Sequence, residues 1–252
     1  MAVLVRRRSG LRPSPDAMTL VEHLGELRRR LVVCLVAFVV AAVAAYVLYP
    51  DILRILEQPY CAAKHAHGAG CALLVTGPLE GFGVRLNVTG YGGLFLASPV
   101  ILFQLWRFVT PGLRANEKRY AIPFVLATLL LFAFGAYVAW LTFPHALGFL
   151  IAVSGPGIMQ LFSASRYLQL VLALMAIFGL AFEFPVVLVA LQLAGVLTPA
   201  RLGRWRRVAI VVIVVVAAIA TPSSDPFSML AMAVPMYLFY ELSILVGRLL
   251  GR

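Results

Sequence analysis

The segment "LRANEKRYAIPFVLATLLLFAFGAYVAWLT" (residues 113–142) places a short basic cluster directly before a long apolar run. Three cations, Arg114, Lys118 and Arg119, surround a single glutamate, Glu117, and the run that follows carries no charged residue. A helix needs about 20 residues to cross the roughly 30 Å hydrocarbon core of a bilayer. The run therefore predicts a membrane-spanning helix, and the cluster predicts the loop that precedes it at the bilayer surface.

The composition of the whole chain supports the same interpretation. Of 252 residues, 62% are hydrophobic and 12% are charged, and the mean hydropathy is +0.97. Soluble domains are about half apolar and about a quarter charged. Inside a bilayer the backbone must satisfy its own hydrogen bonds, in helices or in a closed barrel. Because the apolar runs are continuous rather than alternating, we expect an all-α membrane protein.

We expect six transmembrane helices in this chain. They are predicted at residues 31–49, 83–105, 121–142, 166–191, 208–221 and 227–247. The fifth run has about 13 apolar residues, which at about 1.5 Å per residue is about 10 Å too short for a full crossing. Local thinning of the bilayer or a tilted neighbour would have to cover its end.

The basic residues predict the orientation of these spans. All but four of the 21 lysines and arginines lie in the N-terminal segment, in the loops after the second and fourth spans, and in the C-terminal tail. The exceptions are Arg54, Lys64, Arg85 and Arg166. Loops rich in Lys and Arg stay in the cytoplasm, so both termini are predicted to be cytoplasmic. The net charge of +11 is thus a topology signal, and we expect no nucleic-acid partner.

Five motifs recur along the chain in an order and spacing that resemble the TatC family, the multi-span core subunit of the twin-arginine protein translocase. They are "EHLGELRRRL" (22–31), "GPLEGF" (77–82), "ASPVILFQLWRFVTPGLRANEKR" (97–119), "FGLAFEFPV" (178–186) and "TPSSDPFSMLAMAVPMYLFYE" (221–241). Several of them place a charged residue inside or beside a span. The resemblance covers residues from about 18 to 247.

The resemblance implies six helices in a concave, glove-like arrangement in the bacterial cytoplasmic membrane. The implied function is that of a receptor for the twin-arginine signal peptides of folded cargo proteins. It would export them with TatA-like and TatB-like single-span subunits, driven by the proton motive force. It also implies self-association in a larger complex, no enzymatic activity and no cofactor. The sequence carries no Gly-rich phosphate loop of the G-x-x-x-x-G-K type.

Within this frame the chain divides into three parts. Residues 1–17 are predicted to be a basic, disordered N-terminal extension, and either Met1 or Met18 could be the start of translation. Residues 18–247 form the six-span membrane domain. Residues 248–252 form a cytoplasmic tail.

Two glutamates match the signal-binding positions of the family, Glu117 as the main partner of the signal arginines and Glu26 as its assistant. Each guanidinium of the signal is a planar fork of donors that suits a carboxylate. Phe108 and Arg28 are assigned to the same site, Phe108 as a surface for the apolar residues of the signal. The alternatives are local: Glu26 pairs with Arg30 at helical i,i+4 spacing, Glu117 pairs with neighbouring loop cations, and Phe108 is an ordinary interfacial aromatic.

Glu183 is predicted to lie deep in the fourth span. A charged carboxylate at that depth costs at least about 2.5–3.5 kcal/mol, so it should face protein or water. The resemblance makes it a contact for a partner helix, whereas the alternative is an internal hydrogen bond to Gln169 or Gln192. Glu80 and Asp225 match outer-face positions of the family, and we expect them to be structural or to position a partner.

The first outer loop contains Cys61 and Cys71 together with His65 and His67. Outside the cytoplasm disulfides persist, so a Cys61–Cys71 disulfide is expected. A metal site is the less favoured alternative, because zinc ligands usually come in tighter C-x₂₋₄-C pairs, and free thiols also remain open.

Two other functions compete with export. A proton-coupled small-molecule transporter would suit an intramembrane glutamate and prolines within spans. An intramembrane hydrolase would need a motif such as G-x-S-x-G or H-E-x-x-H, and neither occurs in the sequence.

Overall fold

The computed structural model describes residues 20–66, 73–109, 121–155, 162–222 and 225–249. Within these ranges the chain is helical apart from short turns and one isolated bridge between Leu74 and Ser163. The helices are α1 (Leu20–Val47), α2 (Tyr49–Ala66), α3 (Glu80–Val109), α4 (Ala121–Val153), α5 (Ala164–Ala181), α6 (Phe184–Leu193), α7 (Pro199–Arg204), α8 (Arg206–Ala220) and α9 (Pro226–Leu249). The predicted extension 1–17 lies outside the described residues, and the predicted tail begins inside the last turn of α9.

Among the described residues, five helical segments are long and apolar enough to cross a membrane. They are α1, α3, α4, the α5–α6 pair and α9. The predicted fifth span corresponds to α8, which has only 15 residues, or about 22 Å of helix. The multi-span, all-α class is therefore confirmed with five long helices, and the shortness of the fifth predicted span is a real feature of the fold.

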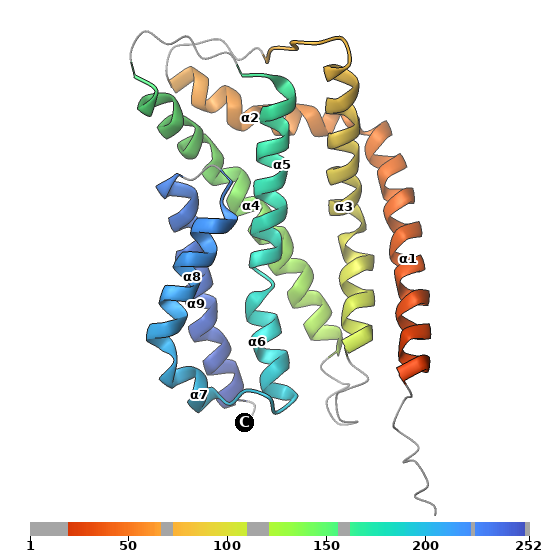
Figure 1. The fold of residues 1–252 in the computed structure, drawn as a ribbon, viewed down its shortest axis with the longest axis vertical. Helices are drawn as coiled ribbons and strands as arrows, with labels where there is room; N and C mark the ends of the chain where they lie inside the picture. Colours follow the sequence, from red (N-terminus) through yellow and green to blue (C-terminus); the bar gives the residue numbers. More distant parts are fainter. Residues whose placement is uncertain (1–19, 67–72, 110–120, 156–161, 223–224, 250–252) are drawn as a thin grey trace, which may run out of the picture.

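Neighbouring helices pack against one another along the length of the molecule (Figure 1). α1 packs along α3, α6 and α8 pack against α9, and α4 crosses α5 obliquely. The start of α1, the end of α3, the start of α4, α7 and the end of α9 all lie at one end of the molecule. This end, here called the basic end, carries Arg28, Arg29, Arg30, Arg107, Arg201, Arg204, Arg206, Arg207 and Arg248.

Helix α2 lies in a segment for which the sequence predicts a loop. It lies across the opposite end of the molecule, against α3 and α4 (Figure 1). Its buried residues Leu56, Tyr60 and Ala63 recur at helical spacing. The indole N–H of Trp140 donates to the carbonyl of Ile55 at 3.2 Å, and the Tyr167 hydroxyl donates to that of Leu56 at 2.6 Å. Packing therefore outweighs the helix-breaking tendency of Pro59.

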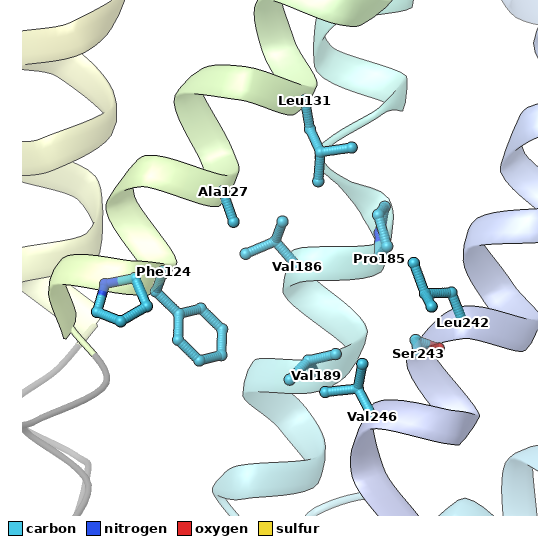
Figure 2. A pocket seen from close by; sticks show the side chains of 10 residues that line it. Phe124, Ala127, Leu131, Pro185, Val186, Val189, Leu242, Ser243 and Val246 are labelled. Atoms are coloured by element: carbon cyan, nitrogen blue, oxygen red, sulfur yellow. The ribbon is translucent and has the colours of Figure 1, made fainter. Parts of the chain in front are cut away.

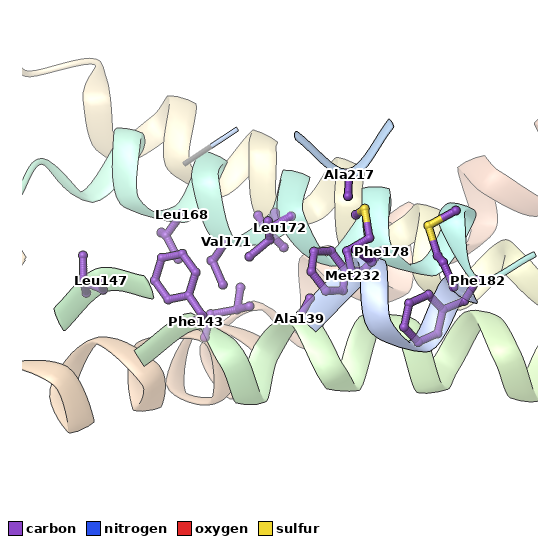
Figure 3. Packing of buried hydrophobic residues seen from close by; sticks show 14 of the residues in the cluster. Ala139, Phe143, Leu147, Leu168, Val171, Leu172, Phe178, Phe182, Ala217 and Met232 are labelled. Atoms are coloured by element: carbon purple, nitrogen blue, oxygen red, sulfur yellow. The ribbon is translucent and has the colours of Figure 1, made fainter. Parts of the chain in front are cut away.

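The core lies where α4 and α5 cross and where α9 joins them. Phe143, Leu168, Leu172, Phe178 and Met232 are buried there (Figure 3). The crossing is close because small residues lie at the contact. A Cβ atom added at Gly135 would lie 2.5 Å from the carbonyl oxygen of Phe178. No larger residue fits between these two helices without moving them.

Candidate functional site

Glu26 lies on α1 at the basic end and forms an ion pair with Arg30, one helical turn further along. Arg30 also reaches α3, where it donates to the side-chain oxygen of Gln104 at 3.4 Å. The Glu26 and Arg30 side chains are only 23% and 12% exposed. The local i,i+4 pairing considered in the sequence analysis is therefore present, and it ties α1 to α3.

A polar cavity of about 160 Å³ surrounds this pair, between α1 and the end of α3. It is lined by Glu26, Arg29, Arg30, Val33, Gln104 and Arg107. Three guanidinium groups thus share the space with one carboxylate among the described residues. Arg29 and Arg107 were not predicted here, because only the register of α1 against α3 brings them together.

The other residues assigned to signal binding are placed differently. Arg28 is exposed, and its separation of two residues on a helix puts it on a different face from Glu26. Phe108 is half-buried near the end of α3. Glu117 belongs to the segment that connects α3 to α4 and lies outside the described residues. The role of Glu117 therefore stays a prediction.

Glu183 lies at the break between α5 and α6. Its backbone keeps helical angles (φ −72°, ψ −16°), and Pro185 occupies the first turn of α6. Proline has no N–H and its ring disfavours a continuous helix, which explains the interruption at this point. The side chain lines a cavity of about 350 Å³ together with Leu102, Leu105, Trp106, Thr128, Leu180, Val187, Ala190, Leu191 and Ala194.

The carboxyl group of Glu183 is the acidic group in the lining of this largely apolar cavity. Its Oε1 atom is buried and has no hydrogen-bond partner within the part of the chain that the structure describes. Gln169 is exposed, and the buried Gln192 donates instead to the carbonyl of Ser243 at 3.0 Å. The alternative of an internal bond to either glutamine is therefore wrong, and the structure does not group these three residues.

Trp106 forms part of the wall of the Glu183 cavity and was missed by sequence reasoning. Its indole N–H donates to the hydroxyl of Thr128 on α4 at 2.7 Å. Thr128 in turn donates to the carbonyl of Phe124 at 2.8 Å. Because Trp106 and Thr128 are almost fully buried, this chain of hydrogen bonds holds α3 and α4 together beside Glu183.

A further apolar cavity of about 270 Å³ lies between α4, α6 and α9. Figure 2 shows Val186 and Val189 of α6 pointing toward the space between Phe124 of α4 and Val246 of α9. The oblique course of α4 carries its first turns away from α9 (Figure 1). Helix α6 consequently borders a cavity on two sides.

The two acids predicted at the outer face, Glu80 and Asp225, have structural contacts at helix starts. Glu80 accepts hydrogen bonds from Thr76, from the Ser163 hydroxyl and from the backbone N–H of Ser165 at 3.2 Å. It therefore joins the start of α3 to the N-terminus of α5, where a carboxylate is favoured. Asp225 is buried and caps α9 by accepting from the N–H of Ser228 at 2.7 Å.

Glu241 of α9 forms an ion pair with Arg206 at the start of α8, whose guanidinium donates to it at 2.7 Å. The hydroxyl of Tyr237 donates to the same carboxylate at 3.1 Å. The pair fastens the short helix α8 to α9 at the basic end.

The cysteines follow the expected pattern as far as they are described. Cys61 is disulfide-bonded and Cys34 is a free thiol. Cys71 lies outside the described residues, so its pairing with Cys61 stays a prediction. Among the described residues no group of three or more His, Cys, Asp or Glu side chains is placed to hold a metal ion.

Comparison with known proteins identifies the family to which this arrangement belongs. The family described as "Sec-independent protein translocase protein (TatC)" matches residues 22–235. This chain belongs to the TatC family. It is a multi-pass membrane component of Sec-independent (Tat) protein translocation and has a transport role rather than an enzymatic one. The family resemblance stated from the motifs is thus confirmed.

Individual TatC proteins are similar over most of this chain. The protein from Frankia casuarinae is 42% identical over 243 residues, which cover 93% of this chain and 67% of the relative. That from Aquifex aeolicus is 39% identical over 241 residues, covering 93% and 97%. A crystal structure of a twin arginine translocase receptor, TatC, is 36% identical in sequence, with a TM-score of 0.74, and the match covers 89% of this chain and 99% of that one.

Proposed function

We propose that this TatC protein is the receptor for twin-arginine signal peptides of folded cargo in a bacterial cytoplasmic membrane. The observation that carries the proposal is the Glu26 carboxylate, held between α1 and α3 in a cavity at the basic end. The similar crystal structure is that of a twin arginine translocase receptor. A signal arginine can replace Arg30 on Glu26, because both offer the same planar fork of donors. Glu117, in the segment that joins α3 to α4, is the proposed main partner, with Phe108 assisting.

The proposed topology has six crossings with both termini in the cytoplasm. The arginines gathered at the basic end support that orientation. Helix α8 is proposed as an additional crossing despite its 15 residues. It runs beside α9 and is fastened to it by the Arg206–Glu241 pair. Local thinning of the bilayer accommodates such a short helix.

The proposed partners are TatA-like and TatB-like single-span subunits. Transport is proposed to be driven by the proton motive force. Several copies of this chain are proposed to associate in a larger complex. Glu183 supports a contact with a partner helix, since it lines an apolar cavity and its buried Oε1 has no hydrogen-bond partner among the described residues. A polar residue of a second transmembrane helix would supply that partner. The disulfide between Cys61 and Cys71 is proposed to stiffen the outer loop.

Crosslinking of a twin-arginine precursor in membranes tests the receptor function. A photoreactive residue is placed at position 33, where Val33 lines the polar cavity beside Glu26, at position 116 next to Glu117 or, as a control at the same end of the molecule, at the exposed position of Arg204. The precursor should crosslink to positions 33 and 116 and not to 204. Replacing the two signal arginines by lysines should abolish both crosslinks, and Glu117→Ala should abolish the crosslink at position 33. Equal crosslinking of the lysine signal would overturn the proposal.

A further inference from the structure

Two cavities of opposite character meet at Arg107, near the end of α3. The polar cavity described above lies between α1 and α3. An apolar cavity of about 440 Å³ lies between the end of α3 and the start of α4, lined on α4 by Ile122, Val125, Leu126 and Leu129. Arg107 lines both. A charged compartment and an apolar compartment thus adjoin at a single side chain.

The polar cavity is lined mainly by cationic side chains. Arg29, Arg30 and Arg107 line it together with one carboxylate, Glu26. The Nε–H of Arg30 is buried and has no hydrogen-bond acceptor within the described ranges. A buried donor without an acceptor is costly. An anion with several oxygens would satisfy it, and phosphate suits the guanidinium fork.

The apolar cavity opens sideways toward the hydrocarbon. Its side chains Phe103, Ile122 and Leu126 are 45%, 81% and 56% exposed within the chain, and they belong to helices long enough to span a membrane. From Ile122 to Leu129 the cavity follows about 10 Å of helix. This length and chemistry fit part of an acyl chain rather than a polar ligand.

We propose that the two cavities together bind one anionic glycerophospholipid. Its phosphate contacts Arg107, Arg29 and Arg30, and one acyl chain lies along the start of α4. Clusters of Arg and Lys at the cytoplasmic boundary of a span attract anionic headgroups. The proposal does not depend on signal binding, because it needs neither a signal peptide nor a partner subunit.

The headgroup half of the site is tested by lipid retention. The full chain is purified in a neutral detergent, incubated with phosphatidylglycerol or phosphatidylcholine of identical acyl chains, and examined by native mass spectrometry. Phosphatidylglycerol should be retained preferentially. Arg107→Gln should lower that retention about fivefold, as expected for about one contact between arginine and an anionic lipid. Arg204→Gln, at an exposed arginine of the same end, should leave it unchanged. Equal retention of both lipids, or no effect of Arg107→Gln, would overturn the proposal.

The acyl half is tested by filling the apolar cavity. Val125→Trp should reduce retention of phosphatidylglycerol, and inorganic phosphate in excess should fail to displace the lipid from the unaltered chain. Displacement by phosphate would instead indicate a site for the free ion and overturn the lipid assignment. Because Val125→Trp can disturb folding, its thermal unfolding is measured alongside, and Ile122→Ala provides a second variant that removes apolar contact without added bulk.

Glu26→Gln separates this site from the signal site. Removing the carboxylate releases Arg30 toward the phosphate, so lipid retention should rise. Signal crosslinking should fall in the same variant. A parallel fall in both would contradict the lipid proposal while leaving the receptor function intact. A rise in lipid retention without any loss of signal crosslinking would contradict the assignment of Glu26 to the signal.

Discussion

Glu26 and Glu183 are carboxylates in two contrasting regions of the same molecule. Glu26, at the basic end, is paired with Arg30 on its own helix and lies among further arginines. Glu183 lies within a long apolar helical segment, and its buried Oε1 has no partner among the described residues. One acid is therefore held by a cation of its own helix, whereas the partner that we propose for the other comes from outside the chain. Substitutions in and between the two regions should differ accordingly in their effects.

The largest effect is expected from closing the gap between α4 and α5, the crossing on which the Glu183 region is built. In Gly135→Ala the new Cβ would lie 2.5 Å from a backbone oxygen of α5, so the helices must separate. Overpacking of this kind costs about 1–3 kcal/mol, which corresponds to a fall of about 5 °C in Tm. Thermal unfolding in detergent measures it.

Gly90→Ala is the matched control for this prediction. Gly90 also lies in a spanning helix, but nothing lies within 4 Å of the position that its Cβ would take. Its Tm should stay the same or rise slightly, because alanine favours a helix over glycine. An equal fall in both variants would mean that the close crossing is not what makes position 135 sensitive.

The next effect concerns Glu183 itself. Glu183→Ala removes the polar group that we propose a partner helix contacts, and such intramembrane contacts contribute about 1–2 kcal/mol. Co-purification of the single-span subunits with the chain should therefore fall about tenfold. The folded protein should be no less stable, because the variant also removes a buried polar atom that lacks a partner among the described residues.

Glu183→Gln is the control for that loss. It keeps hydrogen-bonding capacity at nearly the same volume, so most of the co-purification should be retained. If Glu183→Ala had no effect on co-purification while the protein stayed folded, the proposal that Glu183 contacts a partner helix would be contradicted.

A smaller effect is expected at the wall between the two regions. Trp106→Phe keeps an aromatic ring but removes the N–H that donates to Thr128. Thr128 still donates to the carbonyl of Phe124, so its hydroxyl keeps a partner. The cost should be about 1 kcal/mol, a fall of about 3 °C in Tm. A larger loss, comparable to that of Gly135→Ala, would show that the α3–α4 contact matters more than its single hydrogen bond suggests.

How far the sequence predicts these regions depends on the range of the interactions. Long apolar runs are a local signal, and they predicted α1, α3, α4, the α5–α6 pair and α9. Pairing of Glu26 with Arg30 is also local, since it follows from i,i+4 spacing. Helix α2 was missed because its polar residues and Pro59 resemble a loop, and its stability comes from packing against α4.

Contacts between segments that are distant in the sequence could not be predicted from the sequence pattern. Trp106 and Thr128 are 22 residues apart, and Arg206 and Glu241 are 35 apart. Arg29 and Arg107 meet around one cavity only because α1 and α3 pack in a particular register. Gln192 was considered as a partner of Glu183, but its face of α6 turns toward Ser243 on α9. The helix faces that meet are decided by tertiary packing, for which the apolar runs carry little information.

The smallest effect on the fold is expected at the basic end, where stability and signal binding should respond differently to one substitution. Glu26→Gln removes an ion pair at i,i+4 spacing, which contributes about 0.5 kcal/mol, so Tm should change by less than about 2 °C. The hydrogen bond from Arg30 to Gln104 does not involve Glu26, so α1 stays against α3. The same variant should nevertheless bind a twin-arginine signal poorly, because a neutral amide offers the signal cations no ion pair. Measuring Tm and signal crosslinking on one preparation checks both. A large fall in Tm would mean that the Glu26–Arg30 pair mainly holds α1 against α3. A signal arginine could then not replace Arg30 without destabilising the fold.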